Sequence, residues 1–177
     1  MKKPHVSQNG QLGFEWYTPH LYIAAARRVL GGIGLDPSSS RRANTVVKAL
    51  HYLTIFDDAL DPDTPWVCPG GTLWLNPPFE GSLIRRFATR LLHEMDRGGV
   101  KQAIWLSNNG TETKWAQKLL AAASAVCFPS TRIKFLSPRT LQPREGGGAL
   151  QGQMIIGLNV DADLFTEAYN DLGVVRR

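Results

Sequence analysis

The chain has 177 residues, 43% of them hydrophobic, a length that suits one domain with a buried core and is short for two. Its formal net charge of +5 favours a polyanionic partner such as nucleic acid. Two cysteines without metal-ligand spacing argue against a disulfide framework and a zinc site, so no metal is expected. No apolar run reaches the roughly 20 residues of a membrane span, and no signal-peptide core is visible, so we expect a cytoplasmic protein.

Hydrophobic periodicity and turn residues predict helices and strands that alternate along the chain. The predicted helices cover 19–30, 44–52, 83–95, 113–123 and 163–170. The predicted strands cover 33–36, 72–75, 103–106, 125–128, 132–136 and 153–158. Such alternation indicates an α/β fold with a mostly parallel sheet, in which the last two strands are expected to form an antiparallel edge pair because no helix separates them.

The chain is expected to begin with a loosely held segment, followed by the start of the first helix. The polar, glycine-containing segment 1–14 is expected to be loosely held, ahead of a single domain at 15–177. Thr18 and Pro19 predict the helix start, because a threonine oxygen can accept an orphan amide and proline has no amide to leave unpaired.

The stretch LWLNPPFEG at 73–81 ends a predicted strand at an asparagine, followed by two prolines and an aromatic residue. A residue before proline is pushed into extended geometry, and proline cannot donate to a strand ladder, so the backbone leaves the sheet as a stiff kink. The side-chain oxygen of Asn76 and the carbonyl of Pro77 can then face one pocket as two fixed acceptors. Two such acceptors match one planar amino group, and Phe79 offers a face on which a planar ring can stack.

An exocyclic amine on an aromatic base is a poor nucleophile, because its lone pair is delocalised into the ring. Hydrogen bonds accepted from both of its protons favour a pyramidal nitrogen and restore that electron density. The site then needs an electrophile with a good leaving group, and a sulfonium-bound methyl is the expected one. Ligands in open α/β sheets gather beyond the carboxyl ends of strands, which places Asp36 at the same rim as Asn76.

The tetrapeptide Asn76-Pro77-Pro78-Phe79 resembles the catalytic motif of amino-methyltransferases. The wider order of motifs resembles the phage-type, Dam-like DNA N-6-adenine methyltransferases: EWYTP, GLDPSSS, DDAL with a following tryptophan, NPPF, TETKW and RIKF, over about 15–158. This resemblance implies a Rossmann-like class I methyltransferase fold, S-adenosylmethionine as cofactor, DNA as partner, and a bacterial host cell as location if the chain is phage-derived.

The resemblance also implies residue roles. Catalysis falls to Asn76, Pro77, Pro78 and Phe79. The cofactor is expected beside Thr18, Pro19, Asp36, Pro37, Asp58 and Asn76, with Asp36 facing its amino group and Asp58 its nucleoside end. A last group of residues is expected either to complete the pocket for the base or to contact DNA: Trp115, Arg132, Lys134, Phe135, Arg139 and Arg144. The sequence DPSSS departs from the family pattern because it lacks a glycine-rich continuation, and Phe79 replaces the commoner tyrosine.

Each of these patterns also fits a purely structural explanation. Thr18 fits a helix cap, Asp36 and Asp58 fit turns, Trp115 fits a core position on an amphipathic helix, and the loop at 137–148 fits a flexible hairpin connection. The arginines of the helix after NPPF fit a solvated face.

Three functions stay open at this point. The first is methylation of adenine in DNA, and the second is methylation of another planar amino group, in RNA adenine, cytosine or a protein glutamine. The third is a catalytically silent nucleic-acid-binding protein with this fold. The basic charge argues against a protein substrate, and nothing in the sequence separates DNA from RNA.

Overall fold

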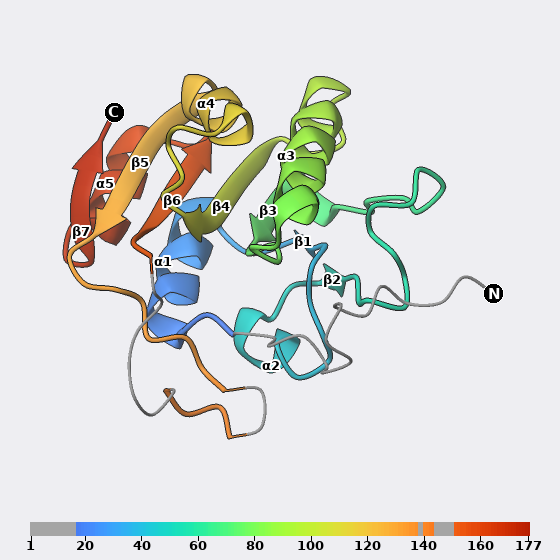
Figure 1. Cartoon of the computed structure of the whole chain (residues 1–177), viewed down its shortest axis with the longest axis horizontal. Helices are drawn as coiled ribbons and strands as arrows, with labels where there is room; N and C mark the ends of the chain where they lie inside the picture. Colours follow the sequence, from blue (N-terminus) through green and yellow to red (C-terminus); the bar gives the residue numbers. More distant parts are fainter. Residues whose placement is uncertain (1–16, 138–139, 144–150) are drawn as a thin grey trace.

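The computed structural model describes residues 17–137, 140–143 and 151–177. Within them the chain forms one seven-stranded sheet with helices on both faces (Figure 1). The helices are α1 (His20–Leu30), α2 (Asn44–Val47), α3 (Gly81–Asp96), α4 (Lys114–Ala121) and α5 (Ala162–Tyr169), with a short 3-10 turn η1 (Pro69–Gly71). The strands are β1 (Leu35–Asp36), β2 (His51–Tyr52), β3 (Thr72–Leu75), β4 (Gln102–Asn108), β5 (Ala123–Pro129), β6 (Gln153–Leu158) and β7 (Gly173–Arg176).

The strands lie in the order β2-β1-β3-β4-β6-β5-β7. Parallel pairing joins β2 to β1, β1 to β3 and β3 to β4. β6 runs antiparallel to both β4 and β5, and β7 runs antiparallel to β5. The predicted α/β fold is therefore confirmed. The sheet is parallel from β2 to β4, whereas the three pairings from β4 to β7 are antiparallel, so the expected parallel arrangement holds for one half of the sheet.

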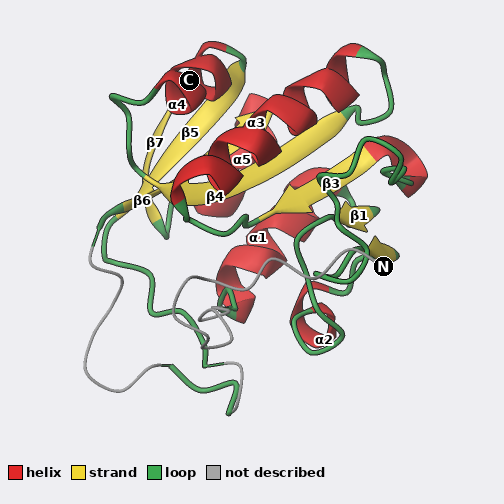
Figure 2. Cartoon of the chain, turned by 45° about the vertical axis from the view of Figure 1, so that its right-hand side comes forward, coloured by secondary structure: helices red, strands yellow, loops and turns green. Residues whose placement is uncertain are grey.

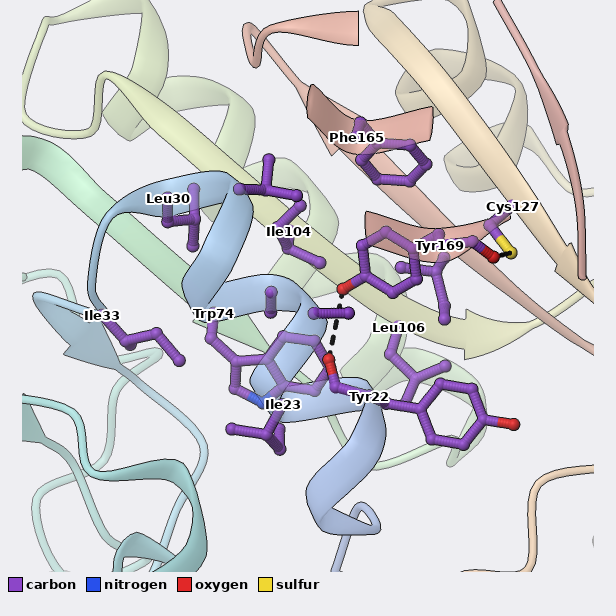
Figure 3. Packing of buried hydrophobic residues seen from close by; sticks show 14 of the residues in the cluster. Tyr22, Ile23, Leu30, Ile33, Trp74, Ile104, Leu106, Cys127, Phe165 and Tyr169 are labelled. Carbon is purple, nitrogen blue, oxygen red and sulfur yellow. Dashed lines mark hydrogen bonds between the residues drawn. The ribbon is translucent and has the colours of Figure 1, made fainter. Parts of the chain in front are cut away.

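Side chains of the central strands alternate between two hydrophobic cores, as the pleat of a strand requires. Trp74 belongs to the core that α1 and α5 cover, whereas its neighbours Leu73 and Leu75 belong to the core that α3 and α4 cover. Figure 2 shows these two pairs of helices on opposite faces of the sheet. In the first core the hydroxyl of Tyr169 donates to the backbone oxygen of Tyr22 at 3.3 Å, which ties α5 to α1 (Figure 3). Hydrophobic cores thus lie on both faces of the sheet.

The predicted helix at 44–52 is wrong in its second half. α2 ends at Val47, Lys48 adopts a left-handed conformation, and β2 follows. The amide of Asn44 exchanges two hydrogen bonds with the backbone of Ala49, at 2.8 and 3.1 Å. This closed turn ends the helix, and a two-residue strand such as β2 is too short to produce a periodicity.

The predicted antiparallel edge pair of 132–136 and 153–158 is also wrong. Residues 132–136 form no strand, and Leu136 makes only isolated bridges, with Tyr17 and Pro143. The amide of Ile133 donates to the side-chain oxygen of Gln153 at 3.0 Å, so a side chain replaces the expected backbone ladder. β6 lies inside the sheet, between β4 and β5, and the antiparallel edge is formed by β7, which was not predicted.

None of the helices in the described part of the chain has the length and apolar character needed to cross a membrane.

Candidate active site

The carboxyl ends of β1 and β3 lie side by side where the chain changes direction across the sheet. From β1 the chain adds β2 on one side, and then returns to add β3 on the other side. Ligands of α/β proteins bind beyond the strand ends at such a switch point. Asp36 ends β1 and Asn76 directly follows β3, so both predicted residues lie at this point of the sheet.

The tetrapeptide forms the connection from β3 to α3. β3 ends at Leu75 and α3 begins at Gly81, and no regular structure covers the residues between them. Pro77 is buried and Pro78 is exposed. The two prolines therefore separate strand from helix in the way that their missing amides and restricted torsions predict.

Thr18 and Asn76 contact each other directly. The Nδ2 atom of Asn76 donates a hydrogen bond to Oγ1 of Thr18 at 3.2 Å. Thr18 is 5% exposed, so this hydroxyl lies inside the protein. The amide of Asn76 is thereby oriented with its nitrogen toward Thr18 and its oxygen turned away from Thr18.

The predicted capping of α1 by Thr18 is wrong. Pro19 occupies the N-cap position, and no side chain caps the helix. The hydroxyl of Thr18 bonds instead to a side chain 58 positions away in the sequence. A local pattern could suggest the helix start, but it contained no signal for this distant partner.

Tyr17 fixes the position of Thr18 through two other motif segments. Its backbone exchanges hydrogen bonds with Leu136, at 3.1 Å from the Tyr17 amide and 2.7 Å from the Leu136 amide. Its hydroxyl lies 2.8 Å from Oγ of Ser40, in the loop after β1. Three segments that are distant in sequence therefore meet at Tyr17, which directly precedes the Thr18 that contacts Asn76.

Phe79 lies between the two cores and packs against both. Its ring meets that of Phe135 edge to face, with centroids 6.2 Å apart and planes at 71°. Phe135 is buried, whereas its neighbours Arg132 and Lys134 are exposed. Phe135 thus supports the ring of Phe79 from inside, and the two basic residues lie on the surface.

Asp36 is 3% exposed and accepts a hydrogen bond from the amide of Ser38 at 3.2 Å. Burial raises the pKa of its carboxyl from 3.8 to about 7, and hydrogen bonds in the following turn offset only part of this effect. Pro37 is buried beside it. A cation brought next to this carboxylate would stabilise its ionised form, so Asp36 fits an ammonium group.

A cavity of about 550 Å³ adjoins the outer parallel strands, and its walls include Tyr52, Leu53 and Asp57. The Oδ2 atom of Asp57 accepts two hydrogen bonds from Thr54, which lowers the pKa of this carboxyl. Asp58 does not line the cavity; it is exposed, has a φ of 47°, and accepts from the amide of Leu60. The acidic pair could be read from the sequence, but not which of the two faces the cavity.

Comparison with known protein families decides the class of protein. The model of the family described as DNA N-6-adenine-methyltransferase (Dam) matches residues 7–167. The chain belongs to this family. No curated protein and no solved structure matches it. The family description implies an enzyme that methylates adenine in DNA, and methyltransferases in general use S-adenosylmethionine. The predicted resemblance is therefore confirmed.

The Dam-family residues expected to face DNA are only partly placed. Trp115 is half-buried and packs against Trp105, with ring centroids 5.9 Å apart. This contact agrees with the structural explanation, in which Trp115 occupies a core position on an amphipathic helix. Arg139 and Arg144 lie outside the described residues. Among the described residues of this Dam-family chain, no group of three or more histidine, cysteine or acidic side chains is arranged to hold a metal.

Proposed function

We propose that this chain transfers a methyl group from S-adenosylmethionine to the exocyclic amine of adenine in DNA, on a Rossmann-like class I methyltransferase fold. The observation that carries the proposal is the oriented amide of Asn76, held by Thr18 at the β1–β3 switch point beside Phe79. The parallel half of the sheet, with β6 reversed inside the other half, supports the fold. We further propose that residues 15–177 form the one domain that carries this activity.

The oxygen of Asn76 and the carbonyl of Pro77 would accept the two protons of the adenine amine. Both acceptors belong to one stiff connection, which would limit their reorganisation. The Oδ1 atom of Asn76 is buried, so the base would reach it only after the groups that cover it move. Phe79 would stack on the base, with Phe135 behind it. Swinging a base out of a duplex costs a few kcal/mol, and these stacking and hydrogen-bonding contacts would recover that cost.

The cofactor would span the carboxyl ends of β1 and β2. When bound, S-adenosylmethionine supplies an electrophilic methyl group. Asp36 would bind the ammonium at its methionine end, since its buried carboxylate gains most from a cation. The cavity beside β2 would take the nucleoside end, with Asp57 accepting from a ribose hydroxyl, and its volume is within the range of small-molecule sites.

Replacing Asp57 with asparagine should weaken cofactor binding by about 10-fold, because a hydrogen bond to a charged acceptor is lost. Asparagine keeps a side-chain oxygen for the bonds from Thr54, so the turn should persist. Asp58→Asn is the matched control and should leave binding unchanged, since Asp58 does not line the cavity. Calorimetric titration of both variants with S-adenosylmethionine checks this, and a greater loss in the Asp58 variant would move the nucleoside end to Asp58.

Replacing Thr18 with valine should lower kcat by about 10-fold, because the bond that orients the Asn76 amide is lost while shape is kept. Thr18→Ser retains the hydroxyl and should restore most of the rate. Single-turnover kinetics with saturating cofactor measure both. If Thr18 served the cofactor instead, the valine variant would show weaker cofactor binding and a normal rate at saturation.

Incubation with methyl-labelled cofactor separates the proposed function from its alternatives. Unmethylated DNA should take up label that is recovered as methylated adenine. Label found only in RNA, cytosine or protein would support a different amino-group substrate, and DNA binding without transfer would support a silent binding protein.

A further inference from the structure

A second hollow lies on the outer side of α3. Its volume is about 440 Å³, and its walls are strongly basic: Arg85, Arg86, Arg90, His93 and Arg97, with Glu94 as the acidic member. Arg86, Arg90, His93 and Arg97 recur at intervals of four, three and four, so they follow one side of the helix, and Arg85 and Glu94 flank that row. We name this hollow the α3 groove.

Arg90 is the structural residue of the α3 groove. Its Nε donates to Glu94 at 2.7 Å, and its other nitrogens bind the backbone oxygens of Asp61 at 3.2 Å and Thr64 at 2.9 Å. Its guanidinium also lies 5.2 Å from the ring centre of Trp66. These contacts hold the turns that follow β2 against α3 and give the groove a fixed wall.

The remaining arginines keep their charge available. Glu94 is neutralised by Arg90 and lies 3.8 Å from Arg97, so it cannot also balance the other arginines. Arg85 and Arg86 are exposed, and neither forms an ion pair within the described part of the chain. The groove is thus a built hollow with excess positive charge, which a mixed solvated helix face would not have.

We propose that the α3 groove binds the phosphate backbone of the DNA that flanks the target base. α3 begins two residues after Phe79, and Arg85 and Arg86 lie about 6 to 8 Å along the helix from its start. Phosphates of the flanking nucleotides therefore come within reach of their guanidinium groups, which bind phosphate oxygens in pairs. This inference rests on DNA as the substrate, but not on methyl transfer itself.

The double variant Arg85→Ala/Arg86→Ala tests the groove through the salt dependence of DNA binding. Each phosphate contact contributes about 0.9 to the slope of log affinity against log salt, so the slope should fall in magnitude by about 2. Fluorescence anisotropy of a labelled duplex with the full chain, titrated at several salt concentrations, measures this slope. Arg85→Lys/Arg86→Lys keeps both charges and should retain most of it.

Lys118→Ala/Arg176→Ala removes the same charge from exposed positions on α4 and β7 that do not line the groove, and should leave the slope nearly unchanged. Thermal unfolding of each variant identifies any that fails to fold, and in that case Arg97→Ala should still reduce the slope, by about 1. Equal slopes for the groove variant and this control, with both folded, would overturn the proposal. That result would mean that the α3 groove does not bind DNA and instead faces solvent or binds an acidic protein. Because the assay needs no methyl transfer, its outcome is separate from that of the labelling experiment.

Discussion

Replacing Asn76 with alanine should lower the rate of methyl transfer by about 10³-fold or more, which abolishes detectable activity. The side-chain oxygen of Asn76 is one of the two proposed acceptors for the adenine amine. Alanine has no such oxygen, so the amine nitrogen of adenine loses a hydrogen bond that raises its electron density. The amide makes its described side-chain bond to Thr18, whereas the carboxylate assigned to the cofactor's ammonium belongs to Asp36 on another strand. Cofactor binding should therefore change by less than about 3-fold.

Rapid-quench measurement of a single turnover, paired with calorimetric titration of the cofactor, separates these two effects. Phe135→Leu is a useful companion variant, since it alters the support of Phe79 without removing an acceptor. Undiminished turnover by the alanine variant would remove Asn76 from the mechanism. A large loss of cofactor affinity would instead assign it to the cofactor site.

Asp36→Asn should reduce affinity for S-adenosylmethionine by about 100-fold at pH 8, because a charge-assisted contact to the ammonium is lost. In the unsubstituted protein the pKa of Asp36 is raised to about 7, so the carboxyl must lose a proton before it can pair with a cation. Affinity should therefore fall by up to about 10-fold for each pH unit below 7, as the carboxyl takes up its proton. The asparagine variant should show no such pH dependence.

The same carboxyl has an opposite effect on stability. Its pKa in the folded protein, about 7, exceeds the ordinary value of 3.8, so the folded state binds the proton more tightly. The contribution of Asp36 to stability is greatest below pH 3.8, falls as the pH rises from 3.8 to 7, and is constant above that range. Asp36→Asn should thus raise the unfolding free energy at pH 8 by roughly 4 kcal/mol or less. Denaturant unfolding at pH 5 and 8 measures this, and a variant that is less stable at both would show that the carboxylate is already compensated.

The kink after β3 could be predicted because it depends on neighbouring residues. Proline restricts its own torsions and those of the residue before it, so the end of β3 at Leu75 follows from the sequence alone. The position of Asp36 at the same point followed from a topological rule for parallel sheets. Both inferences needed only local chemistry and the alternation of elements.

Long-range partners could not be predicted in this way. The hydroxyl of Thr18 was expected at a helix cap and bonds instead to Asn76, which only the tertiary fold brings near. Residues 132–136 have a strand-like alternation, since Ile133 and Phe135 are buried and the basic residues beside them are exposed. Their backbone, however, forms a hydrogen bond with the side chain of Gln153 and isolated bridges, and no strand ladder. Alternation reports which side chains are buried, and it does not report which backbone will pair.

The α3 groove was hidden for a related reason. From the sequence its arginines indicated a solvated helix face. Only the fold shows that the turns at Asp61 and Thr64 close over Arg90 and turn that face into a hollow.

Base-resolved sequencing of DNA from cells that express the chain, compared with cells that express the Asn76→Ala variant, tests the central claim most directly. The account predicts N6-methylated adenine in the first DNA and none above background in the second. Adenines that stay unmodified in both, while the protein is folded and binds S-adenosylmethionine, would contradict it.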